Sequence, residues 1–149
     1  MILYCGPYDL SAFDQIINQK TTVENENQLI DTVLKLFVQQ IGWAYLGESN
    51  WQNSPNIGYT DIMSYLTMAF PKTYITDGNS ISFMEHGIRL EKKLIELGVE
   101  TATYFPSEHY EGNFVHEYQF DFESYGIQAV ENLTRTLQFL ETLFDSPSN

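Results

Sequence analysis

The spacing of apolar residues predicts a chain in which helices alternate with short strands. A continuous apolar run over residues 1–5 is closed by Gly6 and Pro7, which is typical of a buried strand followed by a turn. Residues 47–58 carry turn chemistry around Trp51, which we interpret as an ordered loop. Before that loop, a stripe with helical spacing predicts a helix of about three to four turns, made of Ile30, Val33, Leu34, Phe37, Val38 and Ile41.

The second half of the chain predicts a strand, a helix and a second strand. Residues 72–76 and 99–105 are β-branched and aromatic, and a helical crossover between them makes the two strands parallel. The helix is expected to begin at a capping box of Ser82 and Glu85 and to end at Gly98. Its apolar stripe consists of Phe83, Gly87, Leu90, Leu94 and Leu97.

A final helix follows the loop over residues 106–119. Its apolar stripe is the expected buried face of an amphipathic helix, and it consists of Ile127, Val130, Leu133, Leu137, Leu140 and Phe144. With 149 residues, the chain is the size of one domain.

Composition excludes several classes of function. Seven Lys and Arg against twenty Asp and Glu give a net charge of −13, which repels nucleic acid and anionic membrane surfaces. No apolar run reaches the roughly 18 residues of a membrane-spanning helix, and no targeting segment is visible. A single cysteine, Cys5, forms no internal disulfide and predicts a small buried side chain in a cytoplasmic protein. No glycine-rich phosphate loop occurs, so we expect no nucleotide cofactor.

An acid and a histidine are expected above the carboxyl ends of the two parallel strands. Asp77 directly follows the first strand, and the loop after the second carries His109 and His116. A Ser-His-Asp system needs such neighbours, since the acid orients the imidazole, and the order acid-then-histidine is that of α/β-hydrolases. The alternatives are an Asx turn or helix cap for Asp77 and a solvated, charge-balancing role for the loop histidines. His86, inside the helix, is interpreted as structural.

Other chemistries find weaker support in the residues. A metal site built from His109, His116 and the loop carboxylates is conceivable, but no His-Glu-x-x-His occurs, and we expect no metal. The nucleophile elbow Gly-x-Ser-x-Gly is absent. Ser80 and Ser82 are interpreted as capping residues, and Cys5 as buried, because no histidine is identifiable as its base.

Four stretches together resemble the C-terminal half of α/β-hydrolase esterases and lipases of the bacterial acetyl-esterase-like kind. They run in order along nearly the whole chain: Leu3-Tyr4-Cys5-Gly6-Pro7-Tyr8-Asp9-Leu10, Gly42-Trp43-Ala44-Tyr45-Leu46-Gly47, Phe70-Pro71-Lys72-Thr73-Tyr74-Ile75-Thr76-Asp77-Gly78-Asn79 and His116-Glu117-Tyr118-Gln119-Phe120. The resemblance implies a partial α/β-hydrolase fold, with three mostly parallel strands equivalent to the sixth, seventh and eighth of the family. Within a single domain of residues 1–149, residues 1–10 correspond to a strand and turn, 11–69 to a helical cap and connecting segment, and 70–145 to a βαβα unit.

The same resemblance assigns roles and shows what is missing. Asp77 matches the triad acid and His116 the triad histidine, whereas His109 matches no triad position. The family's oxyanion-hole segment and nucleophile elbow precede its sixth strand, so this chain is expected to start after them. We therefore expect a fragment of a carboxylic ester hydrolase that is inactive alone and acts on a small-molecule ester only when completed. The alternatives are a noncatalytic binding or assembly module, and one half of a split hydrolase that another chain completes.

The opening strand also predicts an oligomer. In the intact fold a preceding strand would pair with it, so in this chain its outer edge is left with unpaired backbone groups. Such edges pair with other chains, and a symmetric dimer closes them most simply. We expect a homodimer or larger assembly through Ile2, Leu3, Tyr4 and Cys5.

Overall fold

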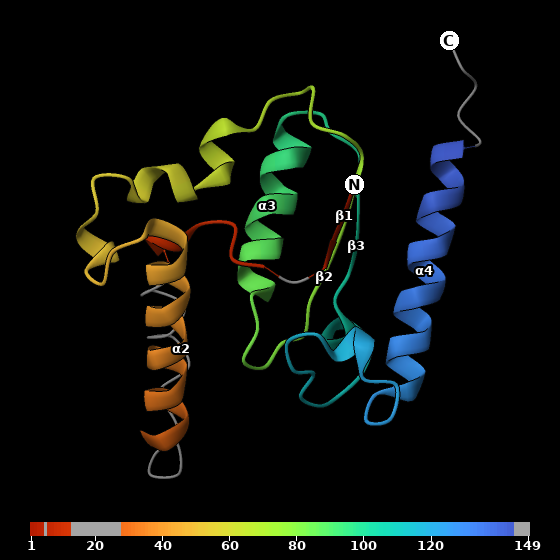
Figure 1. Ribbon diagram of the computed structural model, residues 1–149. Coiled ribbons are helices and arrows are strands. Elements are labelled where there is room, and N and C mark those ends of the chain that lie inside the picture. The colour runs from red at the N-terminus through yellow and green to blue at the C-terminus, as the bar shows by residue number, and fades with distance from the viewer. Residues whose placement is uncertain (5, 13–27, 145–149) are drawn as a thin grey trace. The chain divides into compact units, whose positions relative to one another are not determined.

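The computed structural model describes residues 1–4, 6–12 and 28–144 and divides the chain into two units (Figure 1). Unit 1 comprises Met1–Gly6 and Leu66–Asn149, and unit 2 comprises Pro7–Tyr65. Cys5, and with it the expected end of the opening strand, lies outside the described residues.

Unit 1 is built on a parallel sheet of three strands. The strand order is β1-β2-β3, so the central strand pairs with the opening strand on one side and with the last strand on the other. All four residues of the central strand are buried, which matches their β-branched and aromatic character. The predicted three parallel strands are therefore confirmed, with bounds β1 Ile2–Tyr4, β2 Thr73–Thr76 and β3 Thr101–Tyr104.

Helix α3 (Met84–Glu96) connects β2 to β3 and lies on one side of the sheet (Figure 1). Gly87 allows this close packing: a Cβ there would lie 3.2 Å from the Ile75 side chain. Leu90 and Leu94 are fully buried, and Gly98 ends the helix with φ +73°, as the sequence predicts. Within the part of the chain described, no helix is long and apolar enough to cross a membrane.

The predicted capping box at the start of this helix is wrong. Helix α3 begins at Met84, so its N-cap is Phe83, one residue after the expected Ser82, and Phe83 makes no side-chain cap hydrogen bond. The Ser82 hydroxyl instead donates to the Gly78 carbonyl at 2.5 Å. The Phe83 N–H donates to the Asp77 carboxylate at 2.7 Å, and the Ser82 hydroxyl oxygen has only a 3.5 Å contact with the Met84 N–H.

Helix α4 (Gly126–Phe144) covers the other side of the sheet (Figure 1). The face that it packs against the sheet is not the apolar face that the sequence predicts. Its buried residues are Ala129, Asn132, Thr136 and Phe139, whereas most of the predicted apolar stripe is exposed. The polar side chains are buried because the sheet presents hydroxyl groups that pair with them. Tyr4 donates to Thr136 at 2.7 Å, and Asn132 donates to the Thr76 hydroxyl at 2.7 Å.

Unit 2 contains helix α2 (Gln28–Leu46) and a series of short 3-10 turns. The helix has 19 residues and is longer than the predicted three to four turns. Trp51 is buried, as expected of the centre of an ordered loop, and its ring lies directly over Gly42 of the helix. Of the predicted stripe, Val38 is buried and Phe37 is exposed, and the side chains at 30, 33 and 34 lie outside the described part.

Candidate active site

Asp77 directly follows β2, and its carboxylate is held by two backbone donors. The Gly78 N–H donates to Oδ1 and the Phe83 N–H to Oδ2, each at 2.7 Å. The side chain is only 3% exposed. Both oxygens are therefore fixed in direction, because each accepts a hydrogen bond from rigid backbone. Asp77 therefore does bind backbone N–H groups, as the alternative interpretation expected. Each carboxylate oxygen can still accept a second hydrogen bond, because it has a second lone pair.

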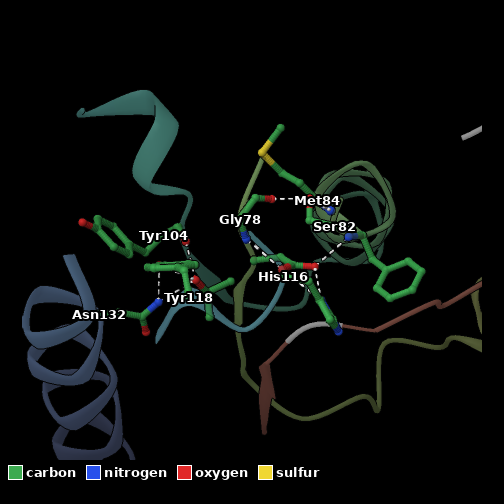
Figure 2. A network of polar contacts seen from close by, with 10 residues as sticks. Gly78, Ser82, Met84, Tyr104, His116, Tyr118 and Asn132 are labelled. Atoms are coloured by element: carbon green, nitrogen blue, oxygen red, sulfur yellow. Dashed lines mark hydrogen bonds and ion pairs between the residues drawn. The ribbon is translucent and has the colours of Figure 1, made fainter. Parts of the chain in front are cut away.

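His116 lies beside this carboxylate, although 39 residues separate the two in sequence (Figure 2). Its Nδ1 atom is 3.3 Å from Oδ1 and 3.4 Å from Oδ2 of Asp77. The imidazole is 28% exposed, and the Phe83 ring packs edge-on against it at 5.0 Å between centroids. The structure thus brings together the acid and the histidine that the sequence singles out, at a distance slightly longer than an optimal hydrogen bond.

The histidine loop is joined to the Asp77 turn by Asn79, which the sequence reasoning did not identify. Its side-chain oxygen accepts the Phe114 N–H at 2.8 Å, and its side-chain nitrogen donates to the Gly112 carbonyl at 3.1 Å. One residue on, the Ser80 N–H donates to the Phe114 carbonyl at 3.0 Å. The segment after β2 and the loop after β3 therefore run side by side like short strands, just before the histidine. The only hint of this in the sequence is the Asp-Gly-Asn turn itself, because Asn side chains readily bond nearby backbone.

A second anchor fixes the loop just beyond the histidine. Glu117 adopts a left-handed conformation with φ 64°, which turns the chain into the short helix of Tyr118–Phe120. Tyr118 is fully buried, and its hydroxyl accepts a 2.5 Å hydrogen bond from Asn132 of α4 (Figure 2). Because His116 lies between two anchored residues, Phe114 and Tyr118, its backbone has little freedom.

A third anchor holds the first part of the loop. The Tyr110 hydroxyl donates to Oε2 of Glu131 in α4 at 2.6 Å, and the Tyr104 hydroxyl donates to the same oxygen at 3.0 Å. Arg135 forms an ion pair with the other oxygen, Oε1, at 2.7 Å. The hydrogen bonds from Tyr110, Arg135 and Tyr104 lower the pKa of Glu131 to about 2. This carboxylate is therefore charged at neutral pH and keeps its three partners.

The remaining candidate residues lie away from this pair or have structural roles. His86 is buried in α3, as expected of a structural residue, and His109 stacks on the Tyr104 ring at 5.4 Å. Ser82 is committed to the Gly78 carbonyl. Among the described residues, no group of three His, Cys, Asp or Glu side chains could hold a metal ion, so the metal alternative gains no support from the structure.

The site consists of a carboxylate of fixed orientation next to a partly exposed imidazole. The Nδ1 atom is turned toward Asp77; a neutral ring with its proton on that nitrogen would offer the Nε2 lone pair on its other side. Such a ring can accept a proton from a hydroxyl group and return it to a leaving group.

In comparisons with known proteins, the chain matches no protein-family model, no curated protein and no solved structure. Unit 1 has an α/β arrangement of three parallel strands flanked by helices.

Proposed function

We propose that this chain supplies the acid and the base of a serine acyl-transfer site, as part of a carboxylic ester hydrolase whose nucleophile lies outside these 149 residues. The observation that carries the proposal is the 3.3 Å approach of His116 Nδ1 to a carboxylate fixed by two backbone N–H groups. The anchored loop supports it, because a merely solvated histidine does not need backbone held on both sides.

In the proposed reaction His116 and Asp77 have separate roles. The Nε2 atom of His116 removes the proton of a serine hydroxyl as that oxygen attacks the ester carbonyl, and it then protonates the departing alcohol. Water, deprotonated by the same nitrogen, releases the acid and regenerates the serine. Asp77 stays ionised throughout, holds the Nδ1–H tautomer and stabilises the imidazolium while it exists. These separate roles agree with the fixed orientation of the Asp77 carboxylate, which lies beside Nδ1 and leaves Nε2 for proton transfer.

In this proposal the serine and the oxyanion hole lie outside the 149 residues. These residues contain no Gly-x-Ser-x-Gly, the motif of the sharp strand-to-helix turn that exposes a nucleophile. The substrate class is a small-molecule carboxylic ester, which follows from the sequence resemblance. The chain alone should be without esterase activity.

A fluorophosphonate probe, which labels only activated serines, tests the proposal. The 149 residues are labelled alone and then together with the segment encoded directly upstream of them, fused or co-expressed. We expect no labelling of the 149 residues alone, and labelling of a Gly-x-Ser-x-Gly serine on the upstream segment in the pair. Hydrolysis of p-nitrophenyl acetate by the pair should fall about 10⁴-fold in His116→Gln and in Asp77→Asn.

The other loop histidine provides the matched control. His109→Gln removes an imidazole from the same loop but not from the pair, so it should leave the rate unchanged. Labelling of a serine in the chain alone, or a complemented rate that survives His116→Gln, would refute the proposal. An upstream segment that lacks the elbow motif and is not labelled would refute it too, in favour of a noncatalytic module.

A further inference from the structure

Phe83 contacts both members of the acid–histidine pair. Its backbone N–H donates to Oδ2 of Asp77 at 2.7 Å. Its ring packs edge-on against the His116 imidazole, with 5.0 Å between the ring centroids and 88° between the ring planes. Since Asp77 also lies 3.3 Å from Nδ1 of His116, each of the three residues contacts the other two. Phe83 therefore holds the acid through its backbone and meets the base through its side chain.

The turn before Phe83 brings this residue back to the acid. Asp77 binds both ends of the turn, because the Gly78 N–H donates to one carboxylate oxygen and the Phe83 N–H to the other. Between them, Ile81 adopts a left-handed conformation with φ 49°, which is strained for a β-branched residue. Strain of this kind persists where the surrounding contacts impose it, and it is common at active sites. The backbone of the turn thus agrees with a requirement for Phe83 at this position.

The environment of Phe83 differs from that of the other residues in its predicted apolar stripe. Leu90 and Leu94 are fully buried, whereas Phe83 is only partly buried. In addition to His116, its ring packs edge-on against a second imidazole, that of His86, at 5.9 Å between centroids. His86 is fully buried in α3, so the ring rests on a close-packed part of the molecule. The Phe83 ring therefore joins a fixed imidazole in the helix to a partly exposed one in the loop.

We infer that Phe83 is a positioning residue for the acyl-transfer reaction, whose ring restricts rotation of the His116 imidazole and shields its contact with Asp77 from water. This inference rests on the proposed function, because that function makes His116 the base. Rotation of the imidazole would move Nδ1 away from the carboxylate and Nε2 away from the serine hydroxyl at the same time. The backbone hydrogen bonds around Asp77 orient only the acid, so the packing of Phe83 supplies the restraint on the base.

NMR of the full chain tests this positioning in the absence of a nucleophile. The quantity measured is the rate at which the Nδ1 proton of His116 exchanges with water, and the signal is assigned by its loss in His116→Gln. We expect a detectable, protected proton in the wild type, and exchange about 10-fold faster or more in Phe83→Leu, which removes the ring but retains the backbone N–H. Phe83→Tyr retains the ring and should retain the protection.

Kinetics of the 149 residues completed by the upstream segment test the effect on the reaction. Phe83→Leu should lower kcat for p-nitrophenyl acetate about 10-fold and leave KM within about twofold, because the ring acts on the base and not on substrate binding. Phe83→Tyr should restore kcat to within about twofold of wild type.

A second partly buried phenylalanine provides the matched control. Phe70 precedes β2, at the end of the strand opposite to Asp77. Phe70→Leu therefore removes the same atoms away from the pair, and it should change neither the exchange rate nor kcat. Circular dichroism checks that all the variants are folded.

Three results would overturn the inference. The first is an Nδ1 proton that is unprotected in the wild type or equally protected in Phe83→Leu. The second is an equal loss of kcat in Phe83→Leu and Phe70→Leu, which would indicate a general effect of packing. The third is a failure of Phe83→Tyr to restore kcat. An inactive completed wild type would instead refute the proposed function, and the exchange rates of the chain alone would still decide whether Phe83 positions His116.

Discussion

Asn132→Ala is expected to lower the free energy of unfolding by about 3 kcal/mol or more. The Asn132 side chain is completely buried and joins three elements of unit 1. Its amide nitrogen donates to Thr76 at 2.7 Å and to Tyr118 at 2.5 Å, and its oxygen accepts from Tyr74 at 3.3 Å. Removing it takes away hydrogen bonds from several buried hydroxyl groups at once and leaves a cavity beside them, and each lost partner costs about 1–3 kcal/mol.

Urea unfolding followed by circular dichroism measures this loss. Gln138→Ala provides the control, because Gln138 is an exposed residue of the same helix, and its change should stay within about 0.5 kcal/mol of wild type. A loss below about 1 kcal/mol in Asn132→Ala would show that the polar face of α4 is not what holds the helix on the sheet.

Gly78→Ala is expected to separate the acid from the histidine. A Cβ at residue 78 would lie 2.0 Å from the Phe114 carbonyl oxygen and 2.3 Å from that of Val115. Both atoms belong to the backbone, so the collision is relieved only if the histidine loop moves away from the Asp77 turn. We expect the free energy of unfolding to fall by about 2–3 kcal/mol, since overpacking of this kind typically costs 1–3 kcal/mol and here also breaks backbone hydrogen bonds.

The same substitution at Gly58 is the matched control. No atom lies within 4 Å of the position that a Cβ would take there, so Gly58→Ala should be neutral or slightly stabilising. Thermal unfolding of both variants gives the comparison. If Gly78→Ala were as stable as Gly58→Ala, the loop and the turn would not be in the close contact described above.

Local pattern was enough to predict the strands and to place an acid and a loop histidine at one edge of the sheet, and the family resemblance selected His116 rather than His109. The β-branched runs predict β2 and β3, and parallel strands place the residues that follow them at one edge of the sheet, which is why Asp77 and His116 could be expected to meet. The residues that hold the pair in place could not be expected in the same way. Asn79 and Asn132 act through partners 35 and 56 residues away, Phe114 and Thr76, and no local spacing records such pairings.

The buried face of α4 shows where pattern reasoning fails. An amphipathic helix is expected to bury its apolar stripe, and the rule assumes that the surface beneath it is apolar. Here the sheet presents the hydroxyl groups of Tyr4, Tyr74 and Thr76, and these pair with Asn132 and Thr136. Most of the apolar residues of the predicted stripe are consequently exposed. The capping box failed because the Ser82 hydroxyl donates to the Gly78 carbonyl and the N-cap is Phe83, whose N–H donates to Asp77.

The tautomer of His116 tests the central claim, that Asp77 aims this imidazole for proton transfer. Nitrogen-15 NMR distinguishes the two neutral tautomers, and the spectrum should be taken about two pH units above the ordinary imidazole pKa of about 6.5. The full chain is used, and the His116 signal is assigned by its loss in His116→Gln. We predict the Nδ1–H tautomer in the wild type, and a change toward Nε2–H in Asp77→Asn, because an amide nitrogen in place of a carboxylate oxygen donates to Nδ1 instead of accepting. An Nε2–H or rapidly averaged imidazole in the wild-type chain would contradict the account.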